Sequence, residues 1–368
     1  MIKNLLLFFL TLTFLIGESK VIFSDTEDNA FKHNAFTDIY NNEGDLYVVF
    51  RSASSHIYEE DSKILIYKLP KNTTKWKKFK TIEDNSSDLR DPFFLPSKDS
   101  NTLKVYIRTR KRTIDQNLSF TRLYTIDSNV TYVEPNATYV EVDKNKTING
   151  WPWRIREQGA WKVKYNNKNK SYYTIAYRKG SVSLYKSRDG IDNFEEVTEF
   201  NLSKFDCKLP TEADIVFKKD SIYTLLRCDG NNSLIGKAQL NDINNTEKWE
   251  FESTGKQLHS PSFLEIDGKI YVAFRDLSNK DFTIIGLSTL DDIKMKNNYR
   301  ILYENKGHNS WDIGYPGMTI LDGKIYISYY ITKFDSNKTL INSSIIVRDI
   351  SKQRKSVIHF PIFKEEKK

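Results

Sequence analysis

The chain has 368 residues, a formal net charge of +8, 39% hydrophobic residues and 13% aromatic residues. Basic and acidic residues are interspersed along it and form no basic stripe, so we expect no nucleic-acid partner. The 21 tyrosines and 22 phenylalanines favour strands over helices. Because all-β domains often exceed the usual domain size of about 150 residues, a single domain is expected.

Residues 1–19 are typical of a secretory signal peptide. Lys3 precedes an apolar run from Leu5 to Ile16, and small residues such as Gly17 follow it. The run is shorter than the roughly 20 residues that cross a bilayer, and no later segment is more apolar, so we expect no membrane span. We therefore predict a secreted, extracellular protein with a folded domain over residues 20–360 and a charged tail over 361–368. A retained N-terminal anchor is the alternative.

Two cysteines and many glycosylation sequons fit this route. Cys207 and Cys228 are the only cysteines, and an even pair in an oxidising compartment forms a disulfide readily; two buried free thiols are the alternative. Asparagines that begin an N-x-S/T sequon indicate a glycoprotein if the chain passes through a eukaryotic secretory route: Asn72, Asn85, Asn117, Asn129, Asn136, Asn145, Asn169, Asn201, Asn231, Asn244, Asn337 and Asn342.

One strand–turn–strand pattern recurs six times. Its second strand is rich in aromatic residues and ends at residues 51, 108, 178, 227, 275 and 330. Asp267-Gly268 and Asp322-Gly323 lie between alternating strands, which is a strong hairpin signal. A repeat of about 50 residues with room for four strands predicts a six-bladed β-propeller of four-stranded antiparallel blades. We expect residues 21–23 to supply the outer strand of the last blade and close the ring.

Two segments resemble the sialidase superfamily, and the resemblance covers nearly all of the chain after residue 19. Gly314-Tyr315-Pro316-Gly317-Met318 is similar to the strand that carries the sialidase tyrosine nucleophile. Thr211-Glu212-Ala213-Asp214, followed by Arg227, resembles the segment with its partner glutamate and second arginine. Ser187-Arg188-Asp189-Gly190 through Phe194 resembles a degenerate Asp-box, a turn motif of these blades.

The chain departs from the sialidase pattern at two arginines. Sialidases hold a carboxylate with three arginines, whose planar forks pair with it in a bidentate manner. Where the first is expected, the chain has Asn34-Ala35-Phe36, and where the third is expected it has His259-Ser260-Pro261. The resemblance therefore implies a glycosidase site and leaves the sugar open.

The predicted site combines residues from the loops and strand ends of several repeats. The resemblance implies Tyr315 as the nucleophile and Glu212 as its base, with Asp91, or less favourably Asp276, as the acid. Arg90 beside Asp91 lowers the pKa of that carboxyl, which disfavours the acid role unless the arginine points elsewhere. The expected substrate-binding residues are Arg51, His56, Arg90, Arg154, Arg227, His259, Arg275, Asp276, Trp151 and Trp153.

Structural roles remain open at most of these positions. Arg90-Asp91-Pro92 can also be interpreted as an ion pair that fixes a loop between blades. Arg275 can be interpreted as the partner of a neighbouring acid. Trp151 and Trp153 flank a proline. Two roles are open for them: a platform on which a sugar stacks, or a plug packed between two blades.

The leading function is a secreted, exo-acting glycoside hydrolase that acts on a glycan or glycoconjugate terminus, with an acidic sugar favoured by the positive charge. An inactive glycan-binding lectin or adhesin is the alternative, and a protein-interaction scaffold is the second alternative. We expect a monomer and no cofactor or metal, because no Cys/His cluster has zinc spacing and no glycine-rich phosphate loop follows a strand.

Overall fold

The structure is a computed structural model that describes residues 19–24, 31–57, 59–97, 101–112, 117–127, 139–140, 159–178, 180–191, 194–294, 298–307, 310–337 and 339–350. These residues form six antiparallel sheets of four strands each, which confirms the predicted all-β six-bladed propeller. The helices among them are short: the 3₁₀ turn η1 (Thr246–Lys248) and α1 (Leu290–Lys294).

The strands of each blade are given from the innermost strand outward, and in blades 1 to 5 they are consecutive in the chain. Blade 1 contains β2 (His33–Asn42), β3 (Asp45–Ala53), β4 (Lys63–Leu69) and β5 (Lys77–Glu83). Blade 2 contains β6 (Asp88–Leu95), β7 (Thr102–Arg112), β8 (Asn117–Asp127) and β9 (Tyr139–Val140). Blade 3 contains β10 (Gly159–Asn166), β11 (Ser171–Arg178), β12 (Ser181–Ser187) and β13 (Glu195–Glu199).

The second half of the chain repeats this arrangement. Blade 4 contains β14 (Pro210–Lys218), β15 (Ser221–Cys228), β16 (Leu234–Gln239) and β17 (Glu250–Ser253). Blade 5 contains β18 (Leu258–Ile266), β19 (Lys269–Asp276), β20 (Phe282–Thr289) and β21 (Arg300–Lys306). Blade 6 contains β22 (Gly314–Leu321), β23 (Lys324–Phe334), β24 (Leu340–Asp349) and β1 (Ser19–Ser24).

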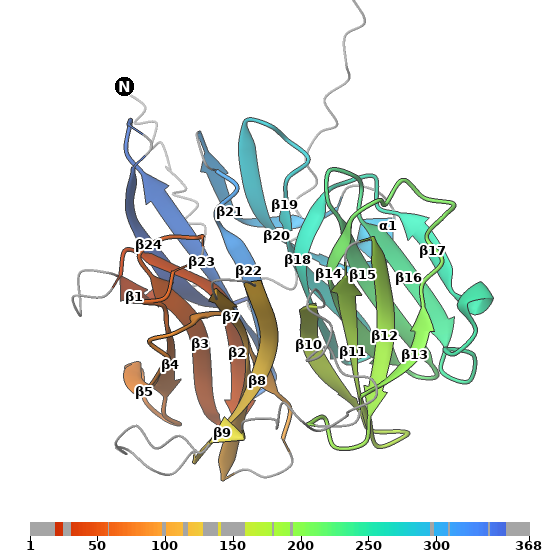
Figure 1. The fold of residues 1–368 in the computed structure, drawn as a ribbon, viewed down its shortest axis with the longest axis horizontal. Coiled ribbons are helices and arrows are strands. Elements are labelled where there is room, and N and C mark those ends of the chain that lie inside the picture. The colour runs from red at the N-terminus through yellow and green to blue at the C-terminus, as the bar shows by residue number, and fades with distance from the viewer. Residues whose placement is uncertain are drawn as a thin grey trace, which may run out of the picture.

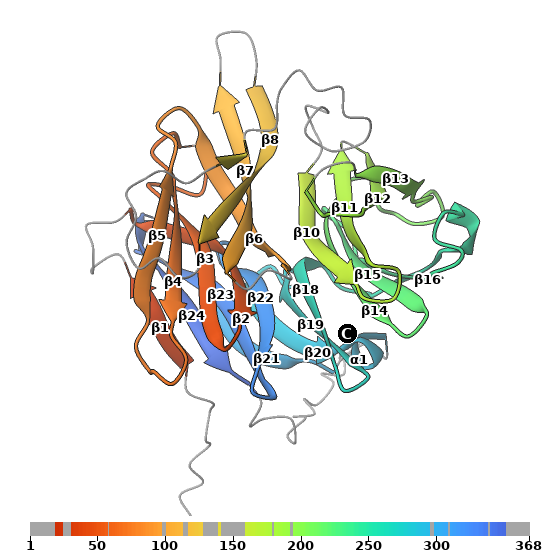
Figure 2. The ribbon, with the colours of Figure 1, turned by 90° about the horizontal axis from the view of Figure 1, so that it is seen from below.

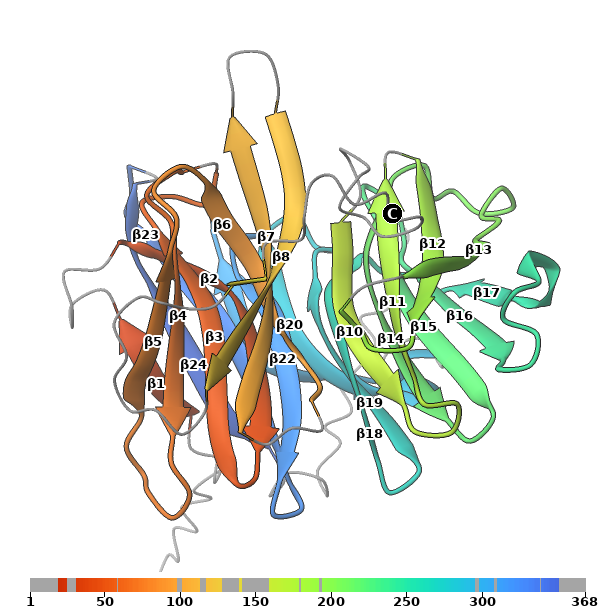
Figure 3. The same cartoon turned by 60° about the horizontal axis from the view of Figure 1, so that its bottom comes forward.

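The six blades surround one central axis (Figure 1). Figure 2 shows them following one another round the molecule, with the innermost strands β2, β6, β10, β14, β18 and β22 toward the middle. Each of these strands contacts the innermost strands of the two neighbouring blades. The β7–β8 hairpin extends beyond the other sheets (Figure 3).

The ring closes through the N-terminal strand. β1 pairs with β24, with Val21 opposite Ile346 and Phe23 opposite Ile345, as the sequence predicts. This pairing makes the sixth sheet from the two ends of the chain and covers the edge of β24 that would otherwise remain open.

The innermost strands share a bulge that shapes the axis. The pairing register of all six shifts near the start of the strand. In five blades the bulge contains a residue with a left-handed φ of 48° to 59°, a conformation uncommon for residues with a side chain. These residues are Phe36, Asp91, Lys162, Ser260 and Tyr315. Bulges re-aim side chains, so each of these five blades offers one unusually directed residue near the axis.

One of them, Lys162, joins four blades across the axis. Its Nζ lies 3.2 Å from Asp38 Oδ1 and donates hydrogen bonds to Ser262 Oγ at 3.0 Å and to the Pro316 carbonyl at 2.9 Å. Lys162 and Asp38 are both buried. The other Asp38 oxygen, Oδ2, accepts a hydrogen bond from the Phe94 amide of blade 2 at 2.9 Å. The axis is thus held by a charged tie that begins in blade 3.

Apolar layers between neighbouring blades provide the core. Between blades 3 and 4, for example, Tyr173, Ile215, Leu226 and Trp249 pack in one buried cluster. Cys207 and Cys228 join the same cluster and form a disulfide, with their Cα atoms 5.1 Å apart, which confirms the predicted pairing. In the described part of the chain, no helix has the length and apolarity needed to cross a membrane.

Candidate functional site

The centre of the site is a hydrogen-bonded chain of Tyr315, Glu212 and Arg227. Tyr315 lies in the bulge of β22, and its Oη donates a hydrogen bond to Glu212 Oε1 over 2.9 Å. The second oxygen of Glu212 accepts a hydrogen bond from Arg227 Nη1. Arg227 Nε also donates to Asp229. Side chains 103 positions apart in the sequence therefore meet, and the carboxylate of Glu212 can receive the tyrosine proton.

Aromatic rings and a second arginine surround the Tyr315 side chain. The Phe36 ring lies 4.8 Å from its ring centroid and the Trp161 ring 5.4 Å from it. The Arg275 guanidinium carbon lies 5.2 Å from the same centroid. Blades 1, 3 and 5 thus contribute side chains around the phenol of blade 6, and blade 4 contributes its hydrogen-bond acceptor.

These surroundings set the protonation of the phenol. Burial raises the pKa of Tyr315, the charge of Glu212 raises it further, and Arg275 and Arg227 oppose the increase. The net effect is a raised pKa, so Tyr315 is protonated at neutral pH and needs a base to become a nucleophile. Burial lowers the pKa of Arg227, but Glu212, Tyr315 and Asp229 together outweigh burial and raise it, so this arginine remains a cation. The pair Tyr315–Glu212 has the geometry of a nucleophile with its base.

Arginines of blade 2 gather around Asp91. Arg90 Nε lies 3.5 Å from Asp91 Oδ2, and Arg108 Nη1 lies 3.7 Å from the same oxygen. Burial alone would raise the pKa of Asp91, but the charges of Arg90, Arg108 and Arg110 outweigh burial and lower it. Burial, Arg90 and Arg108 lower the pKa of Arg110 to about 10, so the three guanidinium groups repel one another. A group of like charges in a partly buried place is typical of anion binding.

Arg51 and Asp276 are engaged in their own local networks. Arg51 is fully buried, forms an ion pair with Asp88 at 2.8 Å, and donates to the carbonyls of Ser55 and Ile57. Asp276 accepts hydrogen bonds from Ser278 and from Tyr299 Oη at 2.8 Å. These contacts give both residues a role in holding loops.

The other predicted residues lie near the centre or outside the described residues. His259 is buried, and burial, Arg227 and Arg275 lower its pKa to about 2, so its imidazole is neutral. His56 lies against Phe36, with a ring-centroid separation of 5.1 Å. Trp151, Trp153 and Arg154 fall outside the described residues, as do residues 1–18 of the predicted signal peptide and the tail at 361–368.

Sequence reasoning missed four residues close to the site: Arg108, Arg110, Trp161 and Asp312. Arg108 ends the second strand of its repeat, so the strand-end pattern that selected Arg51 could also have selected it. Asp312 lies in the loop just before β22, the innermost strand of blade 6. Neither a motif nor a spacing in the sequence distinguishes it from other aspartates.

The fold is that of the sialidase-like propellers. The chain matches no protein-family profile and no curated protein sequence, whereas its structure resembles several solved glycosidases. It superimposes on Trypanosoma rangeli sialidase in complex with sialic acid with a TM-score of 0.55 at 13% identity, over 86% of this chain and 54% of that one. It therefore spans about half the length of the trypanosomal enzyme.

Two further structures extend this likeness. The NanB sialidase of Streptococcus pneumoniae gives a TM-score of 0.56 at 11% identity, over 90% of this chain and 70% of that one. An α-L-arabinofuranosidase of Fusarium graminearum, in complex with an iminosugar inhibitor, gives 0.55 at 10% identity, over 91% of this chain and 99% of that one. Identities this low show a shared fold, and they leave the reaction to be argued from the residues of the site.

Proposed function

We propose that this protein is a secreted, exo-acting glycoside hydrolase, with Tyr315 as nucleophile and Glu212 as the base that activates it. The observation that supports the proposal most strongly is the hydrogen bond of 2.9 Å between the Tyr315 hydroxyl and the Glu212 carboxylate. A purely structural tyrosine would not need a buried carboxylate that is itself held by an arginine. Secretion is supported by the disulfide between Cys207 and Cys228, because such bonds persist in oxidising compartments.

The reaction follows from the positions of these groups. Tyr315 Oη attacks the anomeric carbon of a terminal sugar while its proton passes to Glu212. The bond from that carbon to the leaving oxygen breaks, and the oxygen keeps the electron pair and takes up a proton as it departs. The arginines on either side, Arg227 and Arg275, favour the negative charge that develops on the phenol oxygen. Water then cleaves the glycosyl–tyrosine bond, and Glu212 returns the proton to Tyr315. Two displacements at one carbon retain the anomeric configuration.

The charge of the site favours an acidic sugar. Arg90, Arg108 and Arg110 outnumber the carboxylate that they surround, Asp91, and an anionic ligand would relieve their repulsion. A carboxylated sugar such as sialic acid, with which the trypanosomal neighbour is in complex, fits this preference. The blade-2 arginines would then replace the clamp arginines that are missing from the segments Asn34-Ala35-Phe36 and His259-Ser260-Pro261.

The experiment is a screen of the purified protein with 4-methylumbelliferyl glycosides, including the N-acetylneuraminide, the glucuronide and the α-L-arabinofuranoside. We expect hydrolysis of an acidic glycoside. Incubation with the 2-fluoro glycosyl fluoride of the active sugar, or with 2,3-difluorosialic acid for the neuraminide, should then attach one sugar to the protein. Peptide mapping should place the adduct on Tyr315. Absence of hydrolysis with every glycoside, together with binding on a glycan array, would support the lectin alternative instead.

A further inference from the structure

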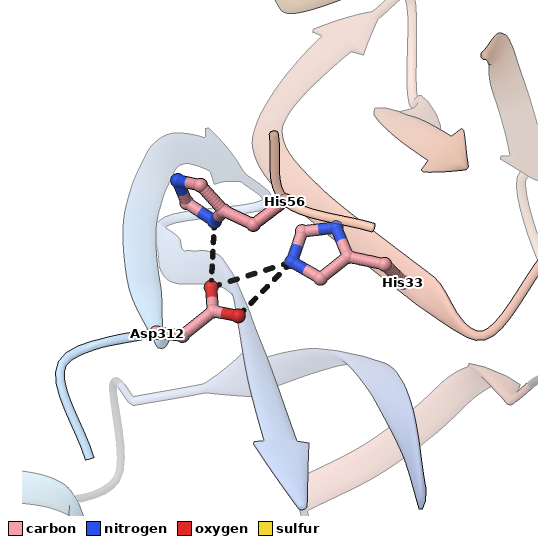
Figure 4. A group of neighbouring side chains, drawn as sticks. All are labelled: His33, His56 and Asp312. Carbon is pink, nitrogen blue, oxygen red and sulfur yellow. Dashed lines mark hydrogen bonds and ion pairs between the residues drawn. The ribbon is translucent and has the colours of Figure 1, made fainter. Parts of the chain in front are cut away.

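A second polar cluster lies beside the Tyr315–Glu212 centre. It consists of His33, His56 and Asp312, which come from β2, from the loop after β3 and from the loop before β22 (Figure 4). Asp312 Oδ1 lies 2.9 Å from His56 Nδ1, and Oδ2 lies 3.1 Å from His33 Nε2. Tyr330 Oη also donates to Asp312 Oδ1 over 2.8 Å. His33 and Asp312 are buried, whereas the His56 side chain is 23% exposed.

The hydrogen bonds determine which nitrogens carry protons. Burial of His33 lowers its pKa more than the hydrogen bond to Asp312 raises it, so this imidazole is neutral. Burial alone would raise the pKa of Asp312, but hydrogen bonds from both histidines lower it, and the carboxylate stays ionised. Each histidine therefore donates an N–H to Asp312. For His56 the donor is Nδ1, and this leaves Nε2 as the atom that can exchange a proton.

A bound divalent cation is a weaker explanation of this cluster. The three possible ligand atoms lie within 4.8 Å of one another, so a cation would fit between them by distance. However, His33 Nδ1 is buried and has no hydrogen-bond partner. A metal on Nε2 would force the proton onto Nδ1, where its N–H would remain buried and unsatisfied, whereas histidine ligands of metals normally donate that second N–H. Donation from Nε2 to Asp312 avoids this cost.

The loop that carries His56 is rigidly held. The buried Arg51 donates hydrogen bonds to the carbonyls of the two residues that flank His56, Ser55 at 2.7 Å and Ile57 at 3.0 Å. The exposed Trp311 lies edge-on to the His56 imidazole, with ring centroids 5.0 Å apart. The position of His56 thus depends on a structural arginine, an aromatic neighbour and a carboxylate, an arrangement typical of an oriented functional group.

His56 and Tyr315 both lie edge-on against one aromatic ring. Phe36 lies 5.1 Å from the His56 centroid and 4.8 Å from the Tyr315 centroid. A second connection runs through Tyr330, which bonds to Asp312 and lies 6.1 Å from the Tyr315 ring. A sugar bound at Tyr315 would therefore have its leaving group within the neighbourhood of His56.

We propose that His56 is the general acid and base of this hydrolase, with Asp312 as the residue that orients its imidazole. The proposal rests on the proposed function. The step starts with His56 as the imidazolium, with one proton on Nδ1 and one on Nε2. As Tyr315 Oη bonds to the anomeric carbon, the bond to the leaving oxygen breaks, its electron pair stays on that oxygen, and His56 gives it the proton from Nε2. In the second step His56 Nε2 takes a proton from the attacking water, so each group ends in its starting state.

The other acids near the centre are less suited to this role. Asp91 is held ionised by the arginines around it, so it has no proton to donate at neutral pH. His259 is buried and neutral, with its pKa lowered to about 2. Among the residues that the structure describes, the charged and titratable groups in contact with His56 are Asp312 and His33.

The test compares His56→Ala with wild type on two glycosides of the same sugar. One has 4-methylumbelliferone as leaving group, which departs with little help from an acid, and the other has a sugar alcohol oxygen, as in a natural disaccharide. We expect His56→Ala to lower kcat/KM on the disaccharide by about 100-fold or more. On the methylumbelliferyl glycoside, the loss in kcat/KM should be at least ten times smaller. Azide should accelerate hydrolysis of the methylumbelliferyl glycoside by the variant and yield a glycosyl azide. The pH profile of kcat/KM for the variant should lose the limb that depends on the acid.

Controls separate catalysis from folding. Ile57→Ala changes an exposed side chain of the same loop and should leave both rates unchanged. His56→Gln, with a wild-type melting temperature, should repeat the leaving-group dependence, and Asp312→Asn should show it more weakly. Equal losses on both substrates, or no loss, would overturn the acid role. Loss of activity with EDTA and recovery with Zn²⁺ would overturn it in favour of a metal site. A wild-type protein that is inactive on every glycoside would instead refute the proposed function itself.

Discussion

Replacement of Lys162 by methionine tests the charged tie across the axis. Methionine keeps an unbranched side chain of similar length and the same backbone conformation, but it removes the ammonium group. Three hydrogen bonds disappear, to Asp38, Ser262 and the Pro316 carbonyl. Asp38 then remains charged and buried without its cation.

The magnitude follows from the burial of the pair. Lys162 is 7% and Asp38 8% exposed, so solvent screens their interaction little, and breaking such a pair costs about 3–5 kcal/mol. Unfolding of a domain of about 330 residues has an entropy of about 0.7 kcal/mol/K, which converts this cost to a melting temperature lower by about 4–7 °C.

Thermal unfolding followed by circular dichroism measures the effect. The double variant Lys162→Met with Asp38→Asn should recover part of the loss, because the unpaired charge is gone while an amide oxygen can still accept the Phe94 amide. An unchanged melting temperature for Lys162→Met would refute the reasoning, and so would a double variant whose loss equals the sum of the two single losses.

Three further predictions concern other parts of the ring. Replacing Cys207 and Cys228 by serine should cost about 2–4 kcal/mol, seen as a lower denaturation midpoint; an unchanged midpoint would show that the disulfide adds no stability. Gly317→Ala should lower the melting temperature, because its Cβ would lie 2.6 Å from Asp38 Oδ1 and 2.7 Å from a backbone nitrogen; an unchanged value would contradict this close packing. His259 has a folded pKa of about 2 against about 6.5 when unfolded, so the unfolded state binds more protons below pH 6.5 and stability falls there as pH falls. His259→Gln should reduce this slope by about 1.4 kcal/mol per pH unit, and equal slopes in urea titrations between pH 4.5 and 6.5 would contradict it.

Local signals made the blades predictable from the sequence. Turns such as Asp267-Gly268 and Asp322-Gly323 join strands that are neighbours in the chain, so each hairpin could be identified without knowledge of the rest of the fold. The outer strand was predicted at residues 21–23 from the count of strands, since a closed ring needs a partner for the last blade; the structure places it at Ser19–Ser24.

Contacts across the axis could not be predicted in the same way. Lys162 and Asp38 are 124 positions apart, and His33 and Asp312 are 279 apart. Ring closure alone brings them together, and a lysine inside a strand pattern looks like any solvent-facing lysine. The Tyr315 and Glu212 positions were identified through their resemblance to known motifs, whereas Asp312 belongs to no such motif.

The central claim is that Glu212 and Tyr315 form the catalytic pair of a glycosidase. Its most direct test is the rate at which wild type and Glu212→Gln hydrolyse the preferred 4-methylumbelliferyl glycoside, measured beside their melting temperatures. Glutamine keeps the shape of the side chain and can still accept the Tyr315 hydrogen bond, but it cannot take up the proton. We predict a kcat lower by about 100-fold or more in a folded protein. A fully active Glu212→Gln variant would contradict the claim.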